Sequence, residues 1–214
     1  IAVDPDVDRL VFIDEKGQIF GEEYTLVACA DYILSKEVGP IVSNLSSTKA
    51  LEDITNQYGG SYTASAVGEV NVVAEMKRVG AVIGGEGNGG IIYPELHYVR
   101  DALVGTALFL SLLAEKQVSV SDLRANYPSY FMSKNKINLK DNVDLDNVLN
   151  KITTQYKNQK ISIIDGIKID FDDGWVHLRK SNTEKIIRIY TEAKSTLAAN
   201  SLAKKFISEI KSFL

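Results

Sequence analysis

The hydrophobic pattern of this chain changes its character near residue 130, and that change limits the folds that the chain can adopt. Between residues 22 and 116, segments with apolar residues at helical spacing alternate with short apolar runs. Such alternation is typical of an α/β unit with a mixed or largely parallel sheet. After residue 128 the order becomes strand, helix, hairpin, strand and helix, which is typical of a small α+β unit. We therefore expect an α/β part followed by an α+β part.

The expected elements follow from apolar spacing and from turn residues. The region at 99–115 is apolar almost all round, as expected of a helix buried between neighbours. Cys29 lies on the apolar face of an expected helix, and as the only cysteine it cannot form an internal disulfide, so we expect it to pack in the core. We predict helices at 24–36, from Ser47 or Thr48 to 58, at 71–78, 99–115, 144–156 and 196–214, and strands at 40–43, 61–66, 81–83, 167–171, 175–179 and 186–190.

Three carboxylates occupy alternate positions near the start of the chain, where Asp4, Asp6 and Asp8 follow a short apolar strand. Side chains in that pattern can converge on one point. Magnesium prefers oxygen ligands in near-octahedral geometry and keeps positions open for phosphate. The segment is therefore a candidate Mg²⁺ site for phosphoryl chemistry, with Arg9 as a neighbouring cation.

Two simpler interpretations of this acidic segment are a calcium-binding loop and a solvated turn. In a calcium-binding EF-hand loop, Glu15 would fall at the last ligand position, but the position that needs glycine holds Arg9. The residues at 10–13 are also an apolar, β-rich run where such a loop would carry ligands. A solvated acidic turn is the other alternative, because short acidic turns are common.

A glycine-rich segment occupies residues 84–90, where five of seven residues are glycine. Glycine lets the backbone approach a ligand closely, while Glu86 and Asn88 supply hydrogen-bonding groups that suit sugar hydroxyls. On its own, the segment is equally consistent with a mobile glycine-rich turn.

A polar segment near the C-terminus is a candidate phosphate cradle. Arg179 offers a planar fork of donors, and Arg188 lies on the expected strand that follows. Ser181, Asn182 and Thr183 between them add hydroxyl, amide and backbone donors. Taken alone, the segment also fits an ordinary polar hairpin end.

Together these segments resemble the motifs of the α-D-phosphohexomutases, the family that includes phosphoglucomutases, phosphomannomutases and phosphoglucosamine mutases. The acidic, glycine-rich and polar segments, with a short element at 67–69, occur in the family's order and at about its spacing. The resemblance implies three parts: residues 1–20 as the end of the second mutase domain with its metal loop, 21–128 as a complete α/β sugar-binding third domain with a mixed sheet, and 129–214 as an α+β phosphate-binding C-terminal domain.

The resemblance also implies an activity, that of an isomerase acting as an intramolecular phosphotransferase. Phosphate would move between the 1- and 6-positions of a hexose through an enzyme phosphoserine and a bisphosphate intermediate. Magnesium on Asp4, Asp6 and Asp8 would stabilise the transferring group with help from Arg9, and the C-terminal cradle would hold the phosphate that is not reacting. The family's Glu and the polar residue two positions later bind sugar hydroxyls, roles that map onto Glu86 and Asn88. The three segments would face one shared cavity.

Two departures from the family pattern qualify this expectation. The donor serine lies upstream of the metal loop in the family, and the segment from Ser43 to Ser47 lacks the histidine of its signature, so we expect a fragment without mutase activity of its own. Gly90 stands where many members have histidine, while His97 and His177 match no motif and are expected to be structural. Glucose, mannose and glucosamine phosphates all remain open as substrates, and a non-catalytic sugar-phosphate-binding module is the alternative.

Composition agrees with part of a cytoplasmic enzyme. The net charge of −4 argues against a general nucleic-acid binder, which usually carries a basic surface. No apolar run reaches the about 18 residues that span a bilayer, so no membrane partner is expected. The expected partners are a hexose phosphate substrate and the missing N-terminal domains of the same protein.

Overall fold

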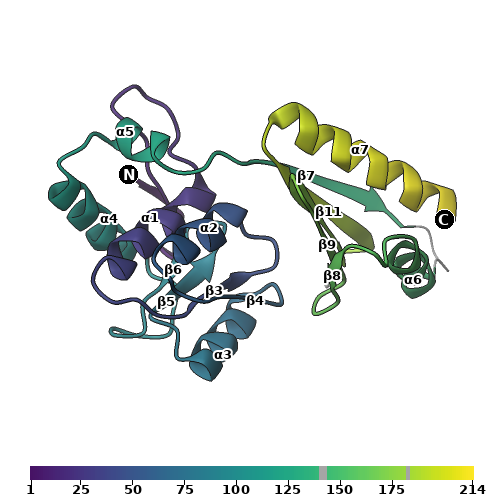
Figure 1. Ribbon diagram of the computed structural model, residues 1–214, viewed down its shortest axis with the longest axis horizontal. Coiled ribbons are helices and arrows are strands. Elements are labelled where there is room, and N and C mark those ends of the chain that lie inside the picture. The colour runs from purple at the N-terminus through teal and green to yellow at the C-terminus, as the bar shows by residue number, and fades with distance from the viewer. Residues whose placement is uncertain (140–143, 182–183) are drawn as a thin grey trace. The chain divides into compact units, whose positions relative to one another are not determined.

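The computed structural model describes residues 1–139, 144–181 and 184–214, and the chain forms two compact units (Figure 1). The first unit is Ile1–Ser129 and the second is Tyr130–Leu214. Each unit has its own main sheet. The main sheet of the first unit is mixed, and that of the second unit is antiparallel. The predicted combination of α/β and α+β architecture is confirmed.

The first unit is built on a four-stranded mixed sheet. The strand order is β4 (Tyr62–Ser65), β3 (Ile41–Asn44), β5 (Ile83–Glu86) and β6 (Gly90–Ile92). β3 pairs in parallel with β4 and with β5, whereas β5 and β6 pair in antiparallel fashion. The parallel pairs bring the carboxyl ends of β3 and β5 to one edge of the sheet, where Asn44 and Glu86 lie.

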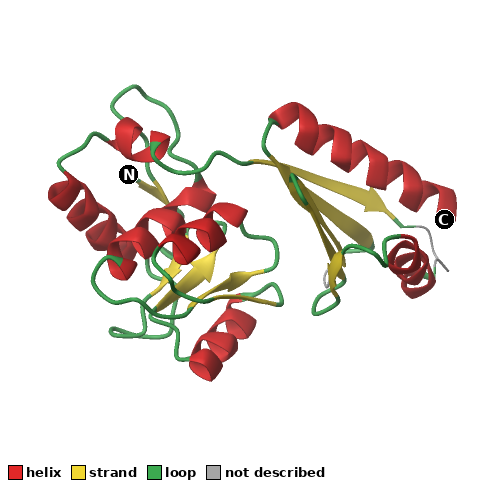
Figure 2. Cartoon of the chain, in the orientation of Figure 1, coloured by secondary structure: helices red, strands yellow, loops and turns green. Residues whose placement is uncertain are grey.

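Helices cover both faces of this sheet, with α1 on one side and α3 on the other (Figure 2). Thr48 caps α2, as predicted, by accepting a hydrogen bond from the Ala50 amide. The predicted start of the apolar helix at 99 is wrong, because Asp101 caps the helix by accepting from the amides of Leu103 and Val104. The helices are α1 (Glu22–Leu34), α2 (Lys49–Gln57), α3 (Glu69–Val79), α4 (Ala102–Lys116) and the short α5 (Val120–Ala125).

The glycine-rich segment is a β-hairpin, so the predicted strand at 81–83 followed by a loop is wrong in its boundaries. β5 runs on to Glu86, and β6 begins at Gly90, which leaves only residues 87–89 as the turn. Glycine spacing alone indicated a loop, but Gly84 and Gly85 pair across the hairpin with Ile92 and Ile91. These glycines are therefore strand residues whose missing side chains let neighbouring elements approach.

A two-stranded ribbon frames the acidic segment. β1 (Ala2–Val3) and β2 (Leu10–Val11) pair in antiparallel fashion, so that residues 4–9 form the connection between them. The Leu10 amide donates to the Gly89 carbonyl at 3.2 Å, and the Thr25 hydroxyl of α1 donates to the Leu10 carbonyl at 3.0 Å. The ribbon is thereby fastened to both the glycine hairpin and α1.

The second unit is a five-stranded antiparallel sheet. The strand order is β7, β11, β10, β9, β8, and every pair is antiparallel. Helices α6 and α7 contribute Ile152 and Phe206 to the same buried cluster as Val176 and Ile189 of the sheet, so both helices pack on one sheet face. The elements are β7 (Phe131–Asn138), α6 (Leu145–Gln155), β8 (Lys160–Ser162), β9 (Ile167–Phe171), β10 (Gly174–Lys180), β11 (Ile186–Ala193) and α7 (Thr196–Phe213).

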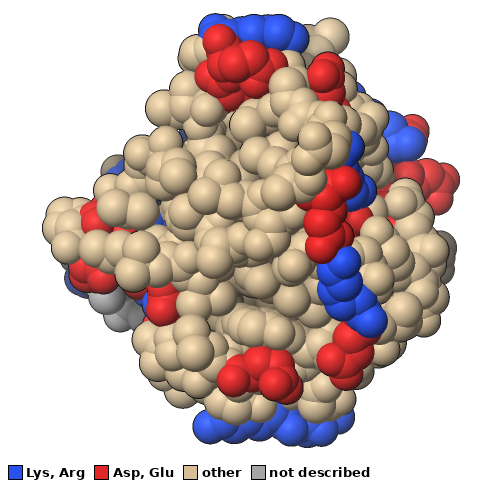
Figure 3. All heavy atoms as spheres, turned by 90° about the vertical axis from the view of Figure 1, so that its left-hand side faces the viewer, with Lys and Arg blue, Asp and Glu red and all other residues tan. Residues whose placement is uncertain are grey.

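Two further features of the chain concern a membrane span and clusters of charge on the surface. None of the helices in the described ranges is both long enough and apolar enough to span a bilayer. The face drawn in Figure 3 shows small groups of acidic and basic side chains of mixed sign around a wide area without charges.

Candidate functional site

The acidic segment folds into a loop that gathers its three carboxylates. Asp4, Asp6 and Asp8 each offer a carboxylate oxygen, and these three atoms lie within 4.8 Å of one another. Asp4 Oδ1 accepts hydrogen bonds from the backbone amides of Asp8 at 3.3 Å and Arg9 at 3.1 Å. The loop therefore closes on its own first carboxylate, and the predicted grouping of the three side chains is confirmed.

The loop reaches this shape through a strained backbone position. Val7 has a φ of 57°, a left-handed conformation that costs energy in a β-branched residue. The Val7 amide donates to the Asp4 carbonyl at 3.1 Å, and the Val7 carbonyl accepts from the Ala102 amide at the start of α4 at 3.2 Å. Strain of this kind persists where surrounding contacts fix it, and it is frequent at functional sites.

The electrostatics of the loop favour a cation. Burial raises the pKa of Asp8, and the neighbouring Asp4 and Asp6 carboxyls add to that rise, while Arg100 opposes it. Burial also tends to raise the pKa of Asp4, but hydrogen bonds from the Arg9 and Asp8 amides and the interaction with the Asp8 carboxyl lower it overall. A divalent cation would relieve the repulsion among the three carboxylates.

One oxygen atom of the loop is particularly well suited to bind a metal ion. Asp8 Oδ1 is buried and has no hydrogen-bond partner among the described residues. Arg9 lies near it, with Nε 3.7 Å from Asp8 Oδ1 and 3.5 Å from Asp4 Oδ2, but its side chain is 53% exposed. A buried carboxylate oxygen without a donor is costly unless a ligand satisfies it, and three oxygen donors are the set that Mg²⁺ prefers.

The glycine hairpin packs directly against the acidic loop. Gly89 has a φ of +84°, and a Cβ there would lie 2.8 Å from the Leu10 backbone nitrogen of β2. Asn88 Oδ1 accepts from the Gly90 amide at 3.1 Å, which stabilises the turn. Asn88 also lines a hollow of about 240 Å³ together with Asp4, Arg9 and Glu22. The two predicted segments thus meet beside one hollow.

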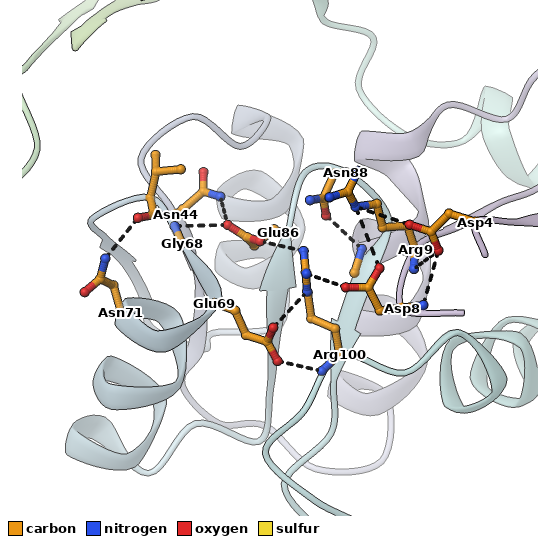
Figure 4. A network of polar contacts seen from close by, with 12 residues as sticks. Asp4, Asp8, Arg9, Asn44, Gly68, Glu69, Asn71, Glu86, Asn88 and Arg100 are labelled. Carbon is orange, nitrogen blue, oxygen red and sulfur yellow. Dashed lines mark hydrogen bonds and ion pairs between the residues drawn. The ribbon is translucent and has the colours of Figure 1, made fainter. Parts of the chain in front are cut away.

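Glu86 lies deeper than its neighbour Asn88. Its residue is 6% exposed, and its Oε1 accepts from Asn44 Nδ2 at 2.9 Å and from the Gly68 amide at 3.2 Å. Its other oxygen, Oε2, accepts from Arg100 Nη1 at 3.0 Å. Glu86 is therefore held on both oxygens by three other parts of the first unit, as Figure 4 shows.

Arg100 is a further residue of this site, and the sequence did not indicate it. This residue precedes α4 and contacts three carboxylates, those of Asp8, Glu69 and Glu86 (Figure 4). Glu69 was noticed only as part of a short motif, whereas here it begins α3 and binds Arg100. An isolated arginine before an apolar helix carries no local signal of such a role.

In the second unit, the structure brings Arg179 and Arg188 together. Arg179 on β10 pairs with Arg188 on β11, and Arg188 pairs with Lys136 on β7. Directly opposed residues point to the same side of a sheet, so three cations share one face. That face is opposite the helices, because the alternate residues Leu178 and Ile187 belong to the helix-packed core. The predicted residues Asn182 and Thr183 lie outside the described residues.

The charges of this cationic row are only partly balanced. Arg179 Nη1 lies 3.9 Å from Asp165 Oδ2, while its buried Nε has no hydrogen-bond partner among the described residues. Arg188 Nη2 donates to Glu184 Oε2 at 3.1 Å. Ser181 is buried, and its hydroxyl accepts from the Glu184 amide at 3.3 Å. An unpaired guanidinium nitrogen beside a second arginine fits an anion such as a phosphate ester.

The histidines and the cysteine lie where ordinary packing explains them. His177 is buried on β10, and burial lowers its pKa to about 4 although its ring contacts the Asp165 carbonyl at 2.7 Å. His97 contacts Asp101 at 3.0 Å beside the cap of α4. Cys29 is buried in α1, and burial raises the pKa of its thiol, so core packing is confirmed for this residue.

Comparison with known proteins gives matches over nearly the whole chain. Residues 21–130 match the family model described as phosphoglucomutase/phosphomannomutase, alpha/beta/alpha domain III, and residues 133–209 match the model for the C-terminal domain of the same proteins. A probable phosphoglucosamine mutase of Methanopyrus kandleri is 32% identical over 99% of this chain and 47% of its own length. A phosphoglucomutase/phosphomannomutase of Thermococcus kodakarensis is 36% identical over 91% of this chain and 43% of its own length.

A solved structure is also similar to nearly the whole chain. The crystal structure of a phosphoglucomutase/phosphomannomutase family protein from Burkholderia thailandensis has a TM-score of 0.85 and 26% identity, covering 99% of this chain and 46% of that one. The chain thus spans about half the length of the curated relatives that it matches. From these matches and from the grouping of the acidic loop with the glycine hairpin, the chain belongs to the α-D-phosphohexomutase family, in which it corresponds to domain III and the C-terminal domain.

Proposed function

We propose that this chain supplies the metal, sugar and phosphate sites of a phosphohexomutase, which interconverts hexose 1-phosphate and hexose 6-phosphate through a phosphoserine and a bisphosphate intermediate. The observation that carries the proposal is Asp8 Oδ1, a buried oxygen with no hydrogen-bond partner among the described residues, which belongs to a group of three carboxylates beside the glycine hairpin. The mutase names of the relatives support the reaction class. Phosphoglucosamine mutase and phosphomannomutase/phosphoglucomutase are the activities that we favour.

In this proposal Asp4, Asp6 and Asp8 hold Mg²⁺, which stabilises negative charge on the transferring phosphoryl group when it is bound. The amides of Asp8 and Arg9 fix the orientation of Asp4, so the loop is organised before the ion arrives. Arg9 stays half exposed at the rim, where its guanidinium adds positive charge next to the same oxygens. Arg9 is therefore the residue of this chain to which we assign a catalytic role.

We assign the sugar contacts to Glu86 and Asn88. Glu86 is fixed by Asn44 and Gly68 on Oε1 and by Arg100 on Oε2, and the second lone pair of Oε2 can accept a sugar hydroxyl. Asn88 lines the hollow beside the acidic loop, and its amide nitrogen offers donors to a second hydroxyl. The pair would orient the ring relative to the metal.

We assign the phosphate that is not reacting to the cationic row of the second unit. Arg179 Nε has no hydrogen-bond partner among the described residues, Arg188 lies opposite Arg179, and Ser181 directly follows β10. Asn182 and Thr183 complete this set on the strength of the sequence alone. A remote grip of this kind lets binding energy position the sugar for transfer.

We further propose that this chain is part of a longer, cytoplasmic protein and that its parts have different roles. We infer that residues 1–20 close a preceding domain, that 21–128 bind the sugar and that 129–214 bind phosphate. The phosphoserine would lie upstream, as the family resemblance implies. Ser43 is unsuited to phosphoryl transfer, because it is buried in β3 and its hydroxyl is hydrogen-bonded to the Tyr62 hydroxyl. Those upstream domains and the hexose phosphate are the partners that we propose.

A coupled assay tests this function. The full-length protein that carries this chain would be assayed with glucosamine, mannose and glucose phosphates, in parallel with Asp6→Asn. We expect mutase turnover on at least one substrate and a loss of roughly 10²–10³-fold in kcat for Asp6→Asn, as is typical when one preorganised charge-stabilising group is removed. Asp173→Asn, in an exposed turn, is the matched control and should leave kcat unchanged.

Two outcomes would contradict the proposal. Wild-type turnover in Asp6→Asn would show that the acidic loop is not the metal site. Binding of hexose phosphate without turnover by the full-length protein would favour the alternative, a non-catalytic sugar-phosphate-binding module.

A further inference from the structure

Arg100 is the centre of the polar network that links the acidic loop to the glycine hairpin (Figure 4). Its side chain is only 14% exposed, and each of its three nitrogens faces a different carboxylate. Nη2 pairs with Asp8 Oδ2, Nη1 donates to Glu86 Oε2 at 3.0 Å, and Nε donates to Glu69 Oε2 at 3.1 Å. These carboxylates come from the acidic loop, the hairpin and the start of α3.

The backbone around Arg100 is fixed as firmly as its side chain. The Arg100 amide donates to Glu69 Oε1 at 3.1 Å, so Glu69 holds both the backbone and the guanidinium. The Asp101 amide donates to the Ile91 carbonyl of β6 at 2.8 Å, and the Ala102 amide donates to the Val7 carbonyl of the acidic loop at 3.2 Å. The segment at 100–102 therefore clamps the acidic loop at two successive residues.

We propose that Arg100 is a positioning residue that sets the distance between the metal ligand Asp8 and the sugar-binding Glu86. This inference rests on the proposed function for the roles of those two carboxylates. A guanidinium is rigid and planar, so two carboxylates bound to its separate arms cannot move independently. Because Nη2 pairs with Asp8 Oδ2, the other oxygen, Oδ1, is left for the cation, and Oδ1 has no hydrogen-bond partner within the part of the chain that the structure describes.

Gly90 provides a second, independent sign of this role. A Cβ at residue 90 would lie 2.5 Å from Arg100 Cδ and 3.1 Å from Cγ, well inside ordinary contact distances. The absence of a side chain at Gly90 therefore gives Arg100 the space that it occupies. The space beside the sugar hairpin at Gly90 is thus filled by a residue from the segment that precedes α4.

The test compares the full-length protein with its variants. Arg100→Lys keeps the charge but loses the fork, Gly90→Ala keeps the guanidinium but displaces it, and Arg78→Gln is the matched control, because it removes an exposed Arg–Glu pair within α3. The measurements are the Mg²⁺ dissociation constant by calorimetry, kcat and KM for the hexose phosphate, and the urea midpoint. A change of fold stability alone would move only the urea midpoint.

We expect Arg100→Lys to raise the Mg²⁺ dissociation constant by roughly 10–100-fold, as is typical when a partner that orients a ligand is lost, and to lower kcat more than it raises KM. Gly90→Ala should produce a change in the same direction. Adding Gly90→Ala to Arg100→Ala should have no further effect, because the displaced side chain is then absent. Arg78→Gln should leave the Mg²⁺ dissociation constant unchanged.

An Arg100→Lys protein that is folded and binds Mg²⁺ like the wild type would overturn the inference and leave the proposed function standing. If Arg100→Lys does not fold, an unchanged Mg²⁺ dissociation constant in folded Gly90→Ala would overturn it equally. A wild-type protein that neither binds Mg²⁺ nor turns over hexose phosphate would overturn both this inference and the proposed function.

Discussion

The carboxylates of the site differ in the partners that orient them, and these partners decide which oxygens remain available to a ligand. Asp4 is oriented by backbone amides of its own loop, whereas Asp8 is oriented by the side chain of Arg100, which precedes α4. Glu86 is oriented by three partners and so behaves as a rigid acceptor. A loop of identical charge without these partners would be an ordinary acidic turn.

His177 shows the opposite case, a titratable group that is kept neutral by burial. Burial lowers its pKa to about 4, from an ordinary value of 6.5. Below pH 6.5 the unfolded chain takes up a proton that the folded chain does not take up until the pH approaches 4. The free energy of unfolding should therefore fall as the pH is lowered through this window, by about 1.4 kcal/mol per pH unit for this group.

Fluorescence of Trp175, the single tryptophan of the chain, reports unfolding of the same strand. Urea titrations at pH 7.0, 6.0 and 5.0 should show the loss of stability in the wild type and a weaker pH dependence in His177→Gln, which keeps a donor for the Asp165 carbonyl. Equal slopes in the two proteins would show that His177 is not the group responsible.

The residues that sequence analysis identified were neighbours in the chain. Asp4, Asp6 and Asp8 carry a local spacing that predicts convergence, and Glu86 and Asn88 lie together in one glycine-rich segment. Arg100 carries no such spacing, because Glu86 and Glu69 lie 14 and 31 residues away from it in the sequence. Its role depends on tertiary contacts that only the fold brings together.

At the scale of elements, apolar periodicity predicted most helices and strands but failed where elements are short. α5 has six residues and β8 has three, too few for a periodic pattern to be visible. The extension of β5 to Glu86 was missed because glycine is typical of turns, whereas here Gly84 and Gly85 are held by pairing with β6.

A buried polar network fastens α1 to its neighbours and should contribute to the free energy of unfolding. Asp31 of α1 accepts from the Tyr58 hydroxyl at 2.6 Å and the Tyr127 hydroxyl at 2.8 Å, and Lys116 Nζ lies 2.8 Å from the same carboxylate. Since hydrogen bonds to a buried charged group are strong and their loss leaves partners unsatisfied, Asp31→Asn should lower the free energy of unfolding by about 2–3 kcal/mol.

Urea unfolding followed by far-ultraviolet circular dichroism measures this loss. Glu115→Gln is the matched control, because the pair of Glu115 with Lys36 is about half exposed on both sides and should be worth less than about 1 kcal/mol. A loss no larger in Asp31→Asn than in Glu115→Gln would mean that the buried network contributes little.

At the scale of the whole molecule, the two units carry different parts of one proposed reaction. The metal loop and the sugar hairpin belong to the first unit, and the cationic row belongs to the second. The family match made this division predictable from the sequence, whereas the contacts that organise each site were not.

The isolated 214-residue chain should therefore bind ligands without turning them over. Assays with excess hexose phosphate and Mg²⁺ should detect no isomerisation by the chain alone, while the full-length protein is active. Robust isomerisation by the chain alone would place the phosphoryl donor within these residues and would refute the assignment of roles.

The proposed function depends above all on Asp4, Asp6 and Asp8 forming a divalent metal site. Diffraction from crystals grown with Mn²⁺, a substitute for Mg²⁺ with a strong anomalous signal, tests it most directly. We expect an anomalous peak at bonding distance from all three carboxylates, with Asp8 contributing Oδ1 while Oδ2 stays on Arg100. A map with no peak at this loop, or with Mn²⁺ bound elsewhere on the chain only, would contradict it.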